Sequence, residues 1–174
     1  GGPQVLLAGS MPTQLEAADF DDDDLIDLLV AAAGDDTLRL FRNIAPPSGT
    51  QGDVAIGSFF ESLSSPKPLA PGTPRALRLG DVNGDDNIDT IATVESVSAT
   101  SGQRSTSVAF YLQSEPGVFE DPVFVSPQRV GNRNGAMAID LGDWNRDGVL
   151  DLFLGWGTSG ASDRNVRVLF GGSR

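Results

Sequence analysis

The residues of this chain best suited to chemistry are aspartates, which recur in three nine-residue segments of one pattern. Each segment fits D-x-[DN]-x-D-x-x-x-D, and the copies begin at Asp19, Asp81 and Asp143, at equal intervals of 62 residues. Protein-bound Ca²⁺ takes about six to eight oxygen ligands, and carboxylates suit it well. Side chains at positions 1, 3, 5 and 9, with the main-chain carbonyl of position 7, can converge on one such ion. The pattern predicts about three Ca²⁺ ions.

We call these segments loop one (19–27), loop two (81–89) and loop three (143–151). Their predicted ligands are Asp19, Asp21, Asp23, Leu25 and Asp27; Asp81, Asn83, Asp85, Asn87 and Asp89; and Asp143, Asn145, Asp147, Val149 and Asp151. The alternative, three solvated acidic turns, is less favourable because like charges about 4 Å apart repel by ~4 kcal/mol at an effective dielectric constant of about 20. Loop one holds six aspartates, so it needs a cation most.

Other positions of the loops predict their packing and backbone. Positions 2 and 8 are apolar in every copy and are expected to pin the loop to the core; these residues are Phe20, Ile26, Val82, Ile88, Trp144 and Leu150. Position 6 is expected to be left-handed. It is Gly148 in loop three, but Asp24 and Asp86 in the other two, and Asp tolerates that region better than most residues.

Two other kinds of calcium loop are excluded by position 12. An EF-hand needs a bidentate Glu there and a following helix, and a dockerin-type loop also needs an acid. Position 12 is Val30, Ala92 and Leu154, and the residues that follow each loop have the apolar character of a strand. The glycine-rich nonapeptide of a calcium β-roll is absent as well.

The segments around each loop predict strands. A first strand is expected at Leu15–Ala18, Ala76–Leu79 and Met137–Leu141; a buried second strand at Leu28–Val30, Thr90–Val94 and Leu152–Leu154; and a third at Leu38–Phe41, Val108–Leu112 and Val166–Phe170. A weaker fourth strand is expected near Ala55–Phe60 and Val118–Val125. Each repeat is therefore a meander of about four strands, the size of a propeller blade.

Composition excludes several classes of function. The 174 residues contain no Cys and no His, which excludes thiolate and histidine metal sites and His-based catalysis. The net charge of −12 argues against a nucleic-acid partner, and no apolar run is long enough for membrane insertion. Thirteen of the 24 acids lie in the three loops, so the rest of the chain is almost neutral.

The three loops and their flanking strands resemble the FG-GAP/VCBS-type repeats of integrin-α-like β-propellers. Leu40-Phe41-Arg42-Asn43 after loop one also resembles a strand of VCBS repeats. The resemblance implies an all-β fold of about three four-stranded antiparallel blades, a partial or half propeller, with calcium in the first hairpin of each blade. We expect one repeat array over 1–174: 1–12 a strand of a preceding or closing blade, 13–70 blade 1, 71–130 blade 2 and 131–174 an incomplete blade 3.

No catalytic set is recognisable, so we expect the chain not to be an enzyme. The acids outside the loops form no motif; they include Glu61, Glu95, Glu115, Glu120 and Asp163. Trp144 is expected in the core. Trp156 is expected to pack between blades, with sugar stacking or partner anchoring as the alternative. Residues 96–107 are expected to form a surface loop.

The expected function is a calcium-stabilised scaffold for protein–protein interaction or adhesion. Its partner would be a protein, or further propeller blades from the same or another chain. The alternatives are a glycan-binding, lectin-like propeller and an accessory domain of a secreted polysaccharide-active enzyme. Calcium sites of extracellular modules have Kd values of about 10⁻⁴–10⁻³ M, so we expect a secreted, periplasmic or cell-surface location.

Overall fold

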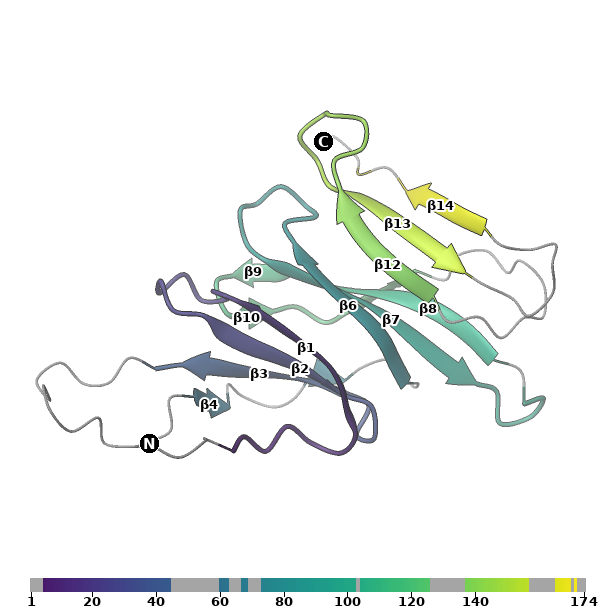
Figure 1. The fold of residues 1–174 in the computed structure, drawn as a ribbon, viewed down its shortest axis with the longest axis horizontal. Coiled ribbons are helices and arrows are strands. Elements are labelled where there is room, and N and C mark those ends of the chain that lie inside the picture. Colours follow the sequence, from purple (N-terminus) through teal and green to yellow (C-terminus); the bar gives the residue numbers. More distant parts are fainter. Residues whose placement is uncertain are drawn as a thin grey trace, which may run out of the picture.

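A computed structural model shows three antiparallel β-sheets side by side and one small hairpin (Figure 1). The structure describes residues 5–44, 60–62, 67–68, 73–102, 104–125, 137–156, 165–169 and 171, and this part of the chain contains no helix. The predicted all-β, antiparallel fold class is confirmed for these residues. That the sheets are blades of a partial or half propeller stays a prediction.

Sheet one contains the first five strands. They are β1 (Pro12–Ala18), β2 (Asp27–Ala32), β3 (Thr37–Asn43), β4 (Phe60–Ser62) and β5 (Lys67–Pro68). The order is β1-β2-β3-β4, and β5 pairs with β3 farther along that strand. The short apolar run of β2 is buried along nearly its whole length, as predicted for an inner strand.

Sheets two and three repeat this meander. Sheet two has the order β11-β8-β7-β6, with β6 (Thr73–Gly80), β7 (Asp89–Val97), β8 (Arg104–Tyr111) and β11 (Val123–Val125). The separate hairpin pairs β9 (Gln113–Glu115) with β10 (Val118–Phe119). Sheet three has the order β12-β13-β14, with β12 (Met137–Gly142), β13 (Asp151–Trp156) and β14 (Asn165–Leu169).

The core lies between neighbouring sheets. One cluster packs sheet one on sheet two and includes Leu29, Leu40, Leu77 and Tyr111. A second cluster packs sheet two on sheet three and includes Ile91, Ile139 and Leu154. Strand β7 supplies both clusters, with Ala92 and Val94 in the first and Ile91 in the second, because successive side chains of a strand face opposite sides. This two-sided burial makes the central strands uniformly apolar.

The predicted strands agree with the sheets, with two differences. Within the described residues, the weaker fourth strand is present as the short β4 and β11, while the start of Val118–Val125 forms β10 of the separate hairpin; residues 55–59 lie outside the described part of the chain. Residues 5–11, within the segment expected to form a strand of another blade, belong to no strand. The carbonyls of Ser10 and Met11 instead accept hydrogen bonds from the N–H groups of Gly34 and Ala33, at the turn after β2. These two residues therefore bond to that turn and not to a neighbouring strand.

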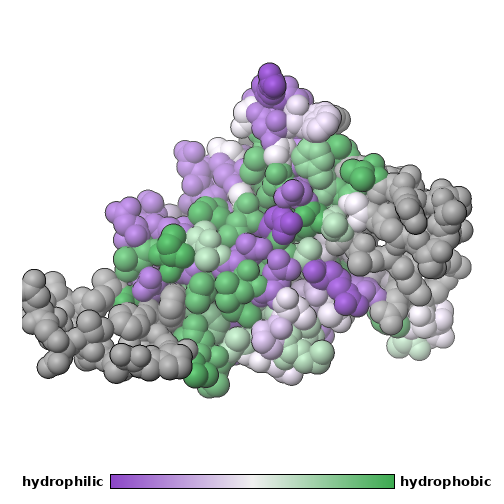
Figure 2. All heavy atoms as spheres, in the orientation of Figure 1, coloured by the Kyte–Doolittle hydropathy of each residue, from purple (hydrophilic) through white to green (hydrophobic). Residues whose placement is uncertain are grey.

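Each aspartate loop connects the first two strands of its sheet, namely β1 to β2, β6 to β7 and β12 to β13. Figure 1 shows the three loops at corresponding ends of the sheets, along one side of the molecule. In Figure 2 the tip formed by loop three is hydrophilic, and hydrophobic residues lie below it. The repeat in the sequence therefore corresponds to a repeat in the structure, in which the three loop-bearing ends of the sheets lie on one side of the molecule.

Candidate metal centre

The ninth aspartate has the same bonding in all three loops. Asp27, Asp89 and Asp151 are fully buried at the start of the second strand. Their Oδ2 atoms accept the N–H of position 2, from Phe20 at 3.1 Å, Val82 at 3.0 Å and Trp144 at 2.8 Å. Their Oδ1 atoms accept an N–H at the end of the third strand or two residues beyond it, from Asn43 at 2.7 Å, Gln113 at 2.9 Å and Gly171 at 3.0 Å. Each ninth carboxylate thus joins the loop to the third strand.

The first and fifth aspartates shape the loop through main-chain N–H groups. The first carboxylate accepts the N–H groups of positions 5 and 6; for Asp143 these come from Asp147 at 3.1 Å and Gly148 at 2.9 Å. The corresponding bonds are present in loops one and two. The fifth carboxylate accepts the N–H of position 7 at 2.9 Å in every loop. Position 7 is thereby held in the loop, where its carbonyl was predicted as a ligand.

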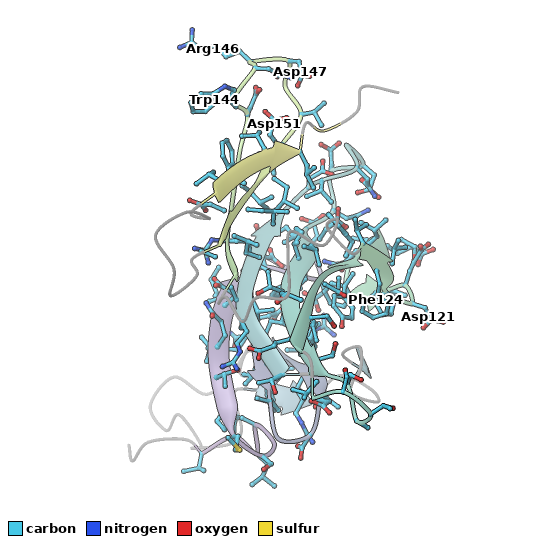
Figure 3. All side chains as sticks on the ribbon, turned by 90° about the vertical axis from the view of Figure 1, so that its right-hand side faces the viewer. Asp121, Phe124, Trp144, Arg146, Asp147 and Asp151 are labelled. Atoms are coloured by element: carbon cyan, nitrogen blue, oxygen red, sulfur yellow. The ribbon has the colours of Figure 1, made fainter. Side chains whose placement is uncertain are left out.

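The loops share a left-handed backbone at positions 4 and 6. The prediction for position 6 is confirmed, with φ of 66° at Asp24, 69° at Asp86 and 87° at Gly148. Position 4 was not predicted and is also left-handed; its residues are Asp22, Gly84 and Arg146. Glycine adopts a left-handed backbone readily, so Gly84 was the one residue in the sequence that could have indicated this conformation at position 4. Figure 3 shows Arg146 at the outer tip of loop three and Asp151 at its base.

Loop one brings three carboxylates together. One oxygen from each of Asp19, Asp21 and Asp27 lies within 4.8 Å of the others, and no other group of three acids in the described residues does so. The Oδ1 atom of Asp21 is buried and has no hydrogen-bond partner. A buried acceptor without a donor is costly, and a cation bound there would supply the missing partner. The donor set therefore suits a hard divalent cation such as Ca²⁺.

Position 3 distinguishes loop one from the other two. In loops two and three it is Asn, whose Nδ2 donates to Oδ2 of the fifth aspartate, at 2.9 Å for Asn83 to Asp85 and 2.8 Å for Asn145 to Asp147. In loop one it is Asp21, and Arg42 of β3 forms ion pairs with Asp21 and, at 3.3 Å, with Asp23. The sequence pattern gave no indication of this arginine, which lies outside the loop.

Burial and neighbouring charge raise the pKa of several loop carboxyls. Burial is the main cause for Asp27 and Asp89, opposed in part by their main-chain hydrogen bonds. Burial also raises the pKa of Asp21; the charge of Asp27 adds to this effect, and Arg42 opposes it. These carboxylates are therefore ionised at a cost, and a bound cation would lower that cost.

The apolar positions of the loops pack unequally. Phe20 is buried, and its ring centroid lies 5.9 Å from that of Phe119 in β10. Val82 and Ile88 are half-buried against the two core clusters. Two predictions were wrong: Ile26 is 54% exposed, and Trp144, expected in the core, is 69% exposed. The ring of Trp144 contacts that of Phe153 edge-on, with the two centroids 5.8 Å apart. Among the described residues, no aromatic ring covers Trp144 in the way that Phe119 covers Phe20.

The remaining candidate positions lie on strands or on their connection. Trp156 ends β13 and pairs with Met137 and Asn165; its side chain lies outside the described residues. Residues 96–97 end β7 and residues 104–107 begin β8, so both ends of the expected surface loop are paired strands, while residues 98–102 are exposed and belong to no strand. Within the described residues, no helix is long and apolar enough to cross a membrane.

Comparison with known proteins gives one relevant similarity. The chain is 26% identical to human integrin alpha-8 over 182 aligned residues, which cover 97% of this chain and 17% of integrin alpha-8. The chain thus spans about one sixth of the length of that protein. No family model matches the chain. No solved structure matches it. The chain is thus similar to an integrin α chain over nearly its whole length, and its fold is all-β.

Proposed function

We propose that this chain is a non-catalytic module of propeller blades that Ca²⁺ stabilises and that serves as a scaffold for protein–protein interaction or adhesion. The observation that carries the proposal is loop one, where three carboxylates gather and one of them, Asp21, has a buried oxygen without a donor. The equal construction of the three loops and the similarity to integrin alpha-8 support it. The partner would be a protein or further blades, in an extracellular or cell-surface setting.

In this proposal the ion has a structural role and takes no part in catalysis. Asp19, Asp21, Asp23 and Asp27 would hold it in loop one, and the ion would supply charge neutralisation to carboxylates that repel one another. The ninth aspartate already joins each loop to the third strand of its sheet. An ion on the same carboxylate would therefore tie the first hairpin to that strand and stiffen the ends of the sheets.

The test is a calorimetric melt of the whole chain in excess chelator and in millimolar Ca²⁺, with equal ionic strength. We expect Tm to rise, because a ligand at about ten times its Kd stabilises the folded state by about 1.4 kcal/mol per site. Mg²⁺ serves as the control, since it demands a tighter, near-octahedral shell. An unchanged Tm would contradict the proposal. The mass in solution of the same samples shows whether calcium also promotes pairing with further blades.

A further inference from the structure

Loop one contains a cation of its own in Arg42. The Nε atom of this arginine forms an ion pair with Oδ2 of Asp21, and Nη2 lies 3.3 Å from Oδ2 of Asp23. Asp21 and Asp23 occupy positions 3 and 5, which are predicted ligand positions. The guanidinium group therefore uses carboxylate oxygens that a calcium ion in this loop would need.

The residue equivalent to Arg42 is uncharged in the other two repeats. The residue just after Arg42 is Asn43, whose N–H bonds the ninth aspartate, and the corresponding donors in sheets two and three are Gln113 and Gly171. The residues before these donors are Leu112 and Phe170, which are uncharged. In loops two and three the amide of Asn83 or Asn145 makes the contact to the fifth aspartate instead. Repeat one thus replaces a neutral amide with a carboxylate and an arginine.

The arginine leaves the acidic cluster incompletely neutralised. Asp21 has a side chain only 10% exposed, and its Oδ1 accepts no hydrogen bond although Oδ2 is paired with Arg42. Gly117, in the turn between β9 and β10, closes over it, because a Cβ built on Gly117 would lie 3.2 Å from Cβ of Asp21. Six aspartates share this loop with one arginine, so negative charge and one unfilled buried acceptor remain beside the guanidinium.

We propose that Arg42 is a built-in counter-cation of loop one that competes with a divalent cation for Asp21 and Asp23. The inference rests on the proposed calcium function. When calcium is scarce, the guanidinium holds the loop in shape; when calcium binds, the arginine must release at least part of this contact. Loop one therefore binds calcium more weakly than its four ligand carboxylates alone would allow, and its occupancy depends on an arginine whose equivalents in the other repeats, Leu112 and Phe170, are uncharged.

The experiment compares Arg42→Gln with wild type by calcium titration calorimetry and by melts in excess chelator, both on the full chain. We expect the variant to bind calcium at one site about three- to tenfold more tightly, since removing the arginine frees two carboxylates. We also expect its Tm in chelator to fall, because the acids of loop one lose their counter-charge. Arg42→Lys keeps the charge without the planar fork and should lie between the two proteins.

Arg39→Gln is the matched control. Arg39 lies on the same strand, has a side chain 26% exposed against 36% for Arg42, and pairs with Asp35 outside the loops. It should leave calcium affinity unchanged. If wild type binds calcium and Arg42→Gln alters neither affinity nor the melt in chelator, the competition is refuted while the calcium function stands.

The remaining outcomes separate the two proposals further. If wild type binds no calcium at loop one but Arg42→Gln does, the competition is supported. If Arg42→Gln folds only when calcium is present, that also supports a counter-cation role. If neither protein binds calcium at any loop, the proposed function and the competition fail together.

Discussion

The ninth aspartate of each loop is part of the fold before any ion binds. Asp89 is fully buried and accepts hydrogen bonds from the N–H groups of Val82 and Gln113. We expect Asp89→Ala to lower the free energy of unfolding by about 2–6 kcal/mol, because each of the two donors left without an acceptor carries a cost of about 1–3 kcal/mol. The loss should persist in excess chelator, where urea unfolding measures it without any contribution from calcium.

Asp85→Ala is the comparison within the same loop. Asp85 lies on the exposed part of loop two, where its Oδ1 accepts the N–H of Asn87 and its Oδ2 accepts a hydrogen bond from Nδ2 of Asn83. Its replacement should affect calcium titrations more than stability in chelator. Equal losses of stability in chelator for the two variants would show that the ninth aspartate has no special structural role.

At the scale of residues, the aspartate spacing indicated loop one as a place where carboxylates gather, and Asp19, Asp21 and Asp27 lie together there. How each carboxylate is bonded depends on the fold. Positions 1 and 5 bond main-chain groups within the loop, so a local pattern can indicate them. The contact of Arg42 with Asp21 and Asp23 depends on the register of β2 and β3, in which Leu28 pairs with Phe41. That register places residue 42 beside the loop, and nothing in the nonapeptide itself carries this information.

Among the elements, the small β9–β10 hairpin links sheet two to loop one. Phe119 packs on Phe20, and Gly117 has a φ of 77° and lies against Asp21. We expect Gly117→Ala to destabilise the protein through two effects. A non-glycine residue with left-handed φ costs about 1–2 kcal/mol, and its Cβ would press on Asp21. Thermal melts with and without calcium measure the loss of stability and any added effect on loop one.

Gly102→Ala separates these effects. Gly102 has a φ of 64°, and a Cβ built there has no atom within 4 Å. It should show the backbone cost alone, without a change in calcium affinity. If the two variants lose the same stability and bind calcium equally, the hairpin does not press on loop one.

The elements were predictable where apolar periodicity and turn residues agree. The buried runs of β2, β7 and β13 are examples. The stretch Val118–Val125 was expected to be one strand, but it divides into β10, which pairs with β9, and β11, which pairs with β8. Local composition favours a strand throughout, and only the choice of partner separates the two. Residues 5–11 pair with no strand in this structure, and the assignment of residues 1–12 to a preceding or closing blade stays a prediction.

At the scale of the whole molecule, the sheets are joined chiefly by apolar burial, and charge adds one link between sheets two and three. The two core clusters each span a pair of neighbouring sheets. On the surface, Nε of Arg78 in β6 donates to Oδ1 of Asp140 in β12 at 3.0 Å. This hydrogen bond, with that from the N–H of Leu141 and the positive charge of Arg78, lowers the pKa of Asp140 from 3.8.

The link predicts a pH dependence of known sign. A carboxyl whose pKa is lower in the folded state stabilises the fold above its unfolded pKa, near 3.8, and loses this contribution as pH falls through the folded value. We expect Asp140→Asn to be less stable than wild type near neutral pH, and the difference to close below pH 3.8. Urea unfolding in chelator across this range measures it, and urea keeps the ionic strength low enough to preserve the ion pair.

The Arg78→Gln background provides the control, because without the guanidinium most of the pKa shift of Asp140 has no cause. In that background the pH-dependent part of the Asp140→Asn effect should largely disappear. The difference in stability between wild type and Asp140→Asn should be small even at neutral pH, since the side chains of Arg78 and Asp140 are largely solvated and exposed ion pairs contribute little. A difference that persists unchanged at low pH would mean that Asp140 acts through packing, and one absent at neutral pH would mean that apolar burial alone joins sheets two and three.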